Sequence, residues 1–365
     1  MFKLKYDDFL IYDEATGTYS MAPDQQVRDE TERNRWKTTG FTILKDWRLY
    51  LMLVPMLFVY ICWKYLPLYE LVAAFQVGDS NEVAERFWYG FENFKALLVP
   101  TNGVWSNTAM GFWRAFRNTF AIAFYGLLFG FPVPIILALF FNEVRSNIAR
   151  SVMQVCVYLP KFMSTVVVTS LAIVIFRGGA SASNYGVVTK FLVWISGHNS
   201  NIVAAAGNNL LFSARYFRAL YVITELWEHA GYDSIVFFAA VIAISPTSYE
   251  AAQIDGAGKM AQMRYVVIPS ILSTVVIMLI MKIGGLLSVS YEKIYLLTPS
   301  ESFGNYAVAD VVSTFANNLQ SPRVSGTAPQ PLLAVAAEMI NNVIGMILVL
   351  GANTIARKAS NVSLY

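Results

Sequence analysis

Residues 245–269 read SPTSYEAAQIDGAGKMAQMRYVVIP, a polar run between two strongly apolar segments. A polar connection between apolar segments of that length must lie at one face of a bilayer. Pro246 is expected to end the incoming helix, and Asp255-Gly256 forms a turn because glycine accepts backbone angles that other residues resist. A second short amphipathic helix follows, and Pro269 suits the first turn of the next apolar helix. The stretch therefore predicts a helical hairpin at a membrane surface.

The composition supports an integral membrane protein. The chain has 365 residues, of which 56% are hydrophobic and only 14% are charged, whereas a soluble domain carries about 25% charged residues. A net charge of +3 gives no reason to expect a nucleic-acid partner. Two cysteines in apolar segments and two isolated histidines predict neither a disulfide nor a metal site.

Six apolar segments are each long enough to cross a hydrocarbon core, which needs about 20 residues. An even number of spans puts both termini on one side, and a modest excess of Lys and Arg places that side in the cytosol. The polar N-terminal region before the first span is predicted to contain a short helix near 24–35, and it lacks the features of a signal peptide. The predicted spans are 47–75, 115–141, 151–176, 217–244, 270–291 and 332–356.

These spans imply a division into four parts. A cytosolic tail covers 1–46, and the first transmembrane helix with its external connection covers 47–111. The core transmembrane domain covers 112–356, and a short cytosolic tail covers 357–365.

Ionisable side chains at membrane depth cost about 2.5–3.5 kcal/mol each, so those that occur are expected to have a role. Lys282 lies near the middle of the fifth span, and Glu225, Glu228 and Asp233 lie along the fourth. Because these spans run in opposite directions, Lys282 and Glu228 are predicted at similar depth. Lys282 should pair with a carboxylate of the fourth span, which would lock two helices together, or line a water-filled path.

The polar run resembles the EAA loop of binding-protein-dependent ABC importer permeases. That pattern is Glu-Ala-Ala, three residues, Gly, nine residues, an aliphatic, one residue, an aliphatic and Pro. Val266 and Ile268 stand where isoleucine and leucine are usual, and Asp255-Gly256-Ala257 matches the form found in sugar importers. The matching residues are Glu250, Ala251, Ala252, Gly256, Val266, Ile268 and Pro269.

The resemblance covers most of the chain from about Tyr50 onward. It is similar to permeases that import complex oligosaccharides beside lipoprotein-type binding proteins, which are relatives of the larger maltose-transporter permease. The chain departs from that group at 178–186 and 317–331, in predicted external connections, which leaves the cargo and the receptor open. The matching stretches include KYLPLYELVAAFQ at 64–76, FWRAFRNTF at 112–120, ELWEHAGYDSIVFFAAV at 225–241 and SYEKIYLL at 290–297.

The resemblance implies an all-α membrane protein with the type I ABC importer permease fold, six transmembrane helices and a cytosolic EAA coupling helix. Its implied partners are a second homologous permease, two ABC ATPase subunits, an extracellular sugar-binding lipoprotein and an oligosaccharide. The segment GAGKM lacks the spacing of a phosphate loop, so no cofactor is expected in this chain, and ATP and Mg²⁺ belong to partner subunits. The residues implied to couple to the ATPase are Glu250, Ala251, Ala252, Asp255, Gly256 and Ala257.

Sugars stack on aromatic rings, so Trp227 and Tyr125 are candidates for the path, although aromatic residues in spans more often pack helices or lie at the interface. Gly126 and Gly130 form a GxxxG pair, which predicts close helix packing.

Three other functions were weighed. A secondary transporter would carry its own binding site, usually between inverted repeats, and no convincing repeat is present. An ABC permease for a non-sugar solute remains an alternative. An enzyme is not expected, because neither HExxH nor a nucleophile–base constellation occurs near the spans.

Overall fold

The computed structural model divides the chain into two compact units, Met1–Glu70 and Leu71–Tyr365. The helix predicted near 24–35 lies outside the described residues. The described residues are 10–13, 18–21, 47–77, 86–100, 103–179, 181–197, 202–203, 207, 209–298, 304–322 and 328–360.

The first unit contains a short antiparallel hairpin and the start of a long apolar helix. Strands β1, Leu10–Asp13, and β2, Thr18–Met21, pair with each other. The mixed polar composition of the tail did not predict this hairpin. Helix α2, Trp47–Tyr60, continues as a wider π-helical segment, η2, Ile61–Tyr65, and then as a tighter 3₁₀ segment, η3, Leu66–Phe75.

Among its described residues, the second unit is mainly helical, with one small hairpin formed by β3, Gln76–Val77, and β4, Phe87–Trp88. Its long helices are α4, Asn107–Gly130, α5, Pro132–Glu143, α10, Phe217–Ile242, α13, Ile268–Gly284, and α17, Pro331–Ser360. The shorter helices are α3, Glu92–Leu98, α6, Asn147–Tyr158, η5, Leu159–Phe162, α7, Thr165–Ile175, η6, Ala182–Asn184, α8, Val187–Ile195, η7, Leu210–Phe212, α11, Pro246–Ile254, α12, Lys259–Gln262, η8, Met263–Val267, α14, Tyr291–Leu297, α15, Tyr306–Ala309, and α16, Val312–Gln320.

Within the described residues, four helices are long and apolar enough to cross a membrane, and up to six segments qualify if each of two bent pairs is one span. The bent pairs are Asn147–Phe162 with Thr165–Ile175, at 103°, and Phe217–Ile242 with Pro246–Ile254, at 67°. The second bend is the predicted turn at Pro246.

Two predicted spans need correction. The third, at 151–176, is not one straight helix, because the chain turns sharply between η5 and α7. Ser164 then caps the new helix by accepting a hydrogen bond from the Val167 amide. The fifth, at 270–291, ends early at Gly284, and the chain starts a new helix at Tyr291.

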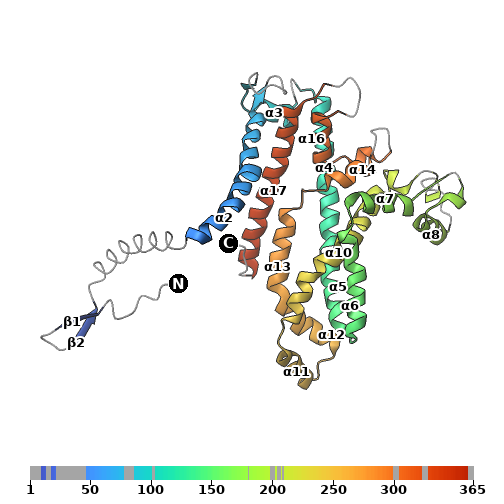
Figure 1. The fold of residues 1–365 in the computed structure, drawn as a ribbon. Coiled ribbons are helices and arrows are strands. Elements are labelled where there is room, and N and C mark those ends of the chain that lie inside the picture. The colour runs from blue at the N-terminus through green and yellow to red at the C-terminus, as the bar shows by residue number, and fades with distance from the viewer. Residues whose placement is uncertain are drawn as a thin grey trace. The chain divides into compact units, whose positions relative to one another are not determined.

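Helix α10 is central to the second unit and packs on α4, α5, α6 and α13, while α17 packs on α13 and α16. Figure 1 shows α11 and α12 at one end of this bundle and α3 and α16 at the opposite end. One apolar cluster joins α7, α10 and α14, a second joins α3, α4, α16 and α17, and a third joins α5, α10 and α13.

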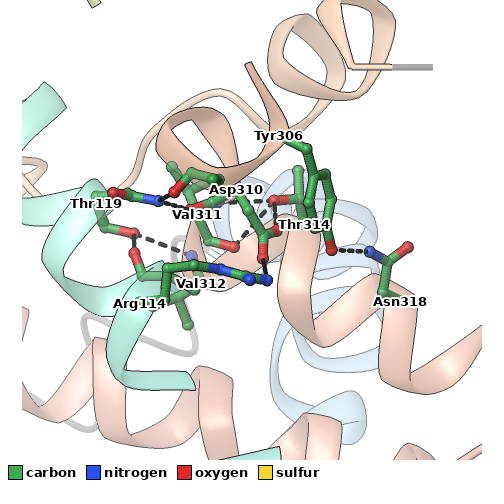
Figure 2. A network of polar contacts seen from close by, with 11 residues as sticks. Arg114, Thr119, Tyr306, Asp310, Val311, Val312, Thr314 and Asn318 are labelled. Carbon is green, nitrogen blue, oxygen red and sulfur yellow. Dashed lines mark hydrogen bonds and ion pairs between the residues drawn. The ribbon is translucent and has the colours of Figure 1, made fainter. Parts of the chain in front are cut away.

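A polar network fastens the segment around α15 and α16 to α4 (Figure 2). The Asp310 carboxylate is fully buried and lies 3.3 Å from an Arg114 guanidinium nitrogen. Thr119 accepts a 2.9 Å hydrogen bond from the Val312 amide, and Thr314 donates a 2.8 Å bond to Asp310. Buried polar groups need such partners, so the network fixes this end of the bundle.

Candidate functional site

The polar run at 245–269 folds as the short helix α11, a glycine turn, and the first turns of a helix that is continuous from Lys259 to Gly284 through α12, η8 and α13. Gly256 has φ +78°, a left-handed conformation that side chains disfavour. The Gly256 amide donates to the Gln253 carbonyl at 3.0 Å, and the Ala257 amide donates to the Ala252 carbonyl at 2.9 Å. This pair of bonds is a Schellman motif, so the predicted turn at Gly256 is confirmed and ends α11 abruptly.

The outer surface of this turn is exposed and combines small with apolar side chains. Glu250, Ala251, Asp255 and Gly256 are exposed, and Ala252 and Ala257 are partly buried. Ile254, Met260 and Tyr265 are 87%, 75% and 72% exposed. These exposed apolar side chains on a helical hairpin form a surface that a protein partner or lipid can cover.

The inner side of the turn rests on the end of α5. The Lys259 ammonium pairs with the Glu143 carboxylate. Tyr249 of α11 and Leu139 of α5 both pack against the third apolar cluster, whose buried residues are Val241, Val267 and Ile271. Burial raises the pKa of the Tyr249 phenol, while a hydrogen bond with the Asn142 side chain acts in the opposite direction.

A hollow of about 480 Å³ opens among α4, η5, α10 and the connection from α13 to α14. Gly126 and Gly130 line it, and a Cβ atom added to either would meet no described atom of this chain within 4 Å. Within the described part of this chain the GxxxG pair therefore faces open space, and the predicted close helix packing is not found there. The lysine, histidine and carboxylate residues that line it are Lys161, Glu225, Glu228, His229, Asp233, Lys282 and Lys293.

Lys293 is the buried centre of these charges. Its side chain is 1% exposed, and its ammonium lies 2.8 Å from Glu228 and 3.0 Å from Glu225. The Tyr221 ring lies 5.5 Å from the same nitrogen. His229 lies on the same side, 3.6 Å from Glu225. Two carboxylates around one ammonium tie α14 to α10 at the wall of the hollow.

Lys282 pairs with a carboxylate of the fourth predicted span, as expected, and the partner is Asp233. The ammonium and carboxylate lie 3.0 Å apart, and both side chains are partly open to solvent. Glu228 was expected at the depth of Lys282, but it forms an ion pair with Lys293 instead. Sequence analysis misses Lys293 because it extends the fifth span to 291, whereas the helix ends at Gly284. The Gly284-Gly285 pair is the sequence signal for this earlier end.

The two aromatic candidates lie apart from this centre. Trp227 and Tyr125 are 47% and 43% exposed and do not line the hollow. Both therefore face outward from the single chain. Glu225, Glu228 and Lys282 are the sequence-predicted path residues that the structure brings to the hollow.

Comparison with known proteins agrees with this architecture. The family described as "Binding-protein-dependent transport system inner membrane component" matches residues 130–351. Protein LplB of Bacillus subtilis is 32% identical over 88% of this chain and 92% of its own length. The polygalacturonan/rhamnogalacturonan transport system permease protein YteP of the same organism is also 32% identical, over 92% of this chain and 95% of its own length.

Solved structures show the same similarity. A chain from a bacterial ABC transporter involved in the import of the acidic polysaccharide alginate superposes with a TM-score of 0.71 and 33% identity. The match covers 90% of this chain and 99% of that chain. A chain from the alginate transporter in complex with an alginate pentasaccharide-bound periplasmic protein gives the same TM-score, over 88% of this chain and 98% of that chain.

Proposed function

This chain belongs to the family of binding-protein-dependent transport system inner membrane components, and we propose that it is the permease subunit of an ATP-driven oligosaccharide importer. It is a multi-pass protein of the plasma membrane and a transport component rather than an enzyme. The observation that carries the cargo assignment is near end-to-end similarity to a permease named for polygalacturonan and rhamnogalacturonan and to an alginate importer.

The proposed topology has six spans, with both termini and the 245–269 turn in the cytosol. It counts the bent pair Asn147–Phe162 with Thr165–Ile175 as one span and α10, without α11, as another. The parts 1–46, 47–111, 112–356 and 357–365 are then the tail, the first helix with its external connection, the core domain and the second tail. A second homologous permease and two ATPase subunits complete the importer, with an extracellular binding protein as cargo donor.

The 245–269 turn is the proposed contact with an ATPase subunit. Small side chains at Ala251, Ala252, Gly256 and Ala257 let a partner surface approach the backbone, and the Glu250 carboxylate is exposed for pairing with a basic group. ATP and Mg²⁺ would be bound by that partner. Because packed helices resist continuous bending, the turn would pass motion to the bundle as rigid-body movement.

The residues that line the hollow are proposed to form part of the wall of the translocation path. Glu225, Glu228 and Lys282 present carboxylates and an ammonium, which can bond the hydroxyl and carboxyl groups of a sugar. Trp227 and Tyr125 point outward, which suits contact with lipid or with the second permease.

The assignment is tested by purifying the tagged chain from its host membrane and measuring what accompanies it. An ATPase subunit and a second permease are expected, together with ATP-dependent uptake of oligogalacturonides, alginate oligosaccharides or arabino-oligosaccharides. Glu250→Lys and Gly256→Asp should keep the chain in the membrane and lose the ATPase, whereas Lys190→Glu on α8 should retain it. Wild-type ATPase yield with both turn variants, or uptake driven by a sodium or proton gradient without an ATPase, would overturn the proposal.

A further inference from the structure

Glu143 and Lys259 each lie at the helix end that disfavours their charge. Glu143 is the last residue of α5, where the helix dipole favours cations, and Lys259 is the first residue of α12, where it favours anions. The two side chains pair with each other across 116 positions of sequence. Neither charge is favoured by the dipole of its own helix, so the ion pair between the helices compensates for both unfavourable positions.

The ion pair is accompanied by a second contact at the last turn of α5. The Tyr249 phenol of α11 is hydrogen-bonded to the Asn142 side chain. Tyr249 and Leu139 also pack against the same buried residues, Val241, Val267 and Ile271. Both halves of the turn, α11 and α12, therefore hold the same short segment of α5.

The other end of α5 lies beside the charged hollow. Helix α5 begins at Pro132, which has no amide hydrogen to bond back into α4, so the connection at Phe131 is a point where the two helices can change angle. Pro134 lines a second hollow of about 180 Å³ together with Asp233 and Lys282. Gly130, just before the connection, lines both hollows.

We propose that the 245–269 turn and α5 move as one body during transport, held by Lys259–Glu143 and Tyr249–Asn142. Motion received at the turn then reaches the wall of the hollow through α5, in addition to the directly connected helices α10 and α13. Lys259 and Glu143 are positioning residues. The inference rests on the proposed importer function.

The exposure of the pair separates positioning from stability. The side chains of Lys259 and Glu143 are 65% and 36% exposed, and exposed ion pairs contribute little to folding. Loss of the pair should therefore leave the fold and the membrane level of the chain unchanged. Arg145 offers a matched control, because it is exposed, lies two residues from Glu143, and forms no ion pair among the described residues.

The first experiment reverses charges in the complete importer, reconstituted with its binding protein in proteoliposomes. Lys259→Glu should lower binding-protein-stimulated ATP hydrolysis and uptake by about fivefold, with unchanged ATPase co-purification and melting midpoint. The double variant Glu143→Lys with Lys259→Glu should return both rates to within about twofold of wild type. Arg145→Glu should match wild type.

The second experiment asks whether the two residues stay together through the cycle. Cys62 and Cys156 are free, so both are replaced by alanine before Glu143→Cys and Lys259→Cys are introduced. Bridging the new pair with a short bis-maleimide should preserve uptake if the turn and α5 move together.

Outcomes for the two proposals are distinguishable. If wild-type proteoliposomes import none of the oligosaccharides, the importer assignment fails. If wild type imports sugar but Lys259→Glu behaves like Arg145→Glu, or bridging the cysteines abolishes uptake, the movement of α5 with the turn is refuted.

Discussion

Replacing Lys293 with methionine removes the ammonium from between Glu225 and Glu228 while keeping an unbranched side chain. Lys293 is 1% exposed and Glu228 is 8% exposed, so the variant strands a buried carboxylate. Removing one partner of a buried ion pair destabilises a protein by about 3–5 kcal/mol. For a chain of this size that corresponds to a fall in melting midpoint of about 5 °C.

Thermal unfolding of the purified chain in one mild detergent, followed by tryptophan fluorescence, measures this effect. Lys282→Met is the matched control, because its pair with Asp233 is 45% and 29% exposed and should contribute less than about 1 kcal/mol. Adding Glu228→Gln to Lys293→Met should recover most of the loss, since no buried charge then remains unpaired. Equal shifts for Lys293→Met and Lys282→Met, or no recovery in the double variant, would refute the reasoning.

Two further substitutions test packing by the same melting assay. Gly231→Ala would place a Cβ atom 2.1 Å from the Val157 carbonyl oxygen, so it should lower stability by at least about 2 kcal/mol. Gly126→Ala should be neutral or stabilise by up to about 1 kcal/mol. Equal effects of the two substitutions would contradict the close packing of Gly231 on Val157. Thr119→Val leaves the Val312 amide without its acceptor and should lower the free energy of unfolding by about 1–3 kcal/mol. An unchanged melting midpoint would show that this hydrogen bond does not stabilise this end of the bundle.

The parts of the fold that sequence predicted are those set by local chemistry. The turn at Gly256 follows from a glycine that can adopt a positive φ. This effect acts within a few residues, so no knowledge of the tertiary structure is needed. Pro269, which sequence analysis places in the first turn of the next helix, lies instead inside a helix that is continuous from Lys259 to Gly284.

The predictions were wrong where apolar residues continue without interruption but the helix does not. Mean hydropathy does not detect the sharp turn before Ser164 or the end of α13 at Gly284. Because the predicted span runs past Gly284, Lys293 of the next helix was not recognised as a buried charge. The partners of Lys282 and Glu228 depend on helix rotation, which a one-dimensional depth argument cannot supply. Gly126 and Gly130 likewise needed knowledge of what faces them.

In the proposed topology the exposed Ile254, Met260 and Tyr265 of the 245–269 turn face the cytosol, and this has a consequence for how the cell makes this protein. Uncovered apolar side chains in water promote self-association and attract chaperones and proteases. A copy synthesised in excess of its neighbours would therefore be short-lived. The same surface would thus keep subunit numbers matched, by exposing any orphan to degradation.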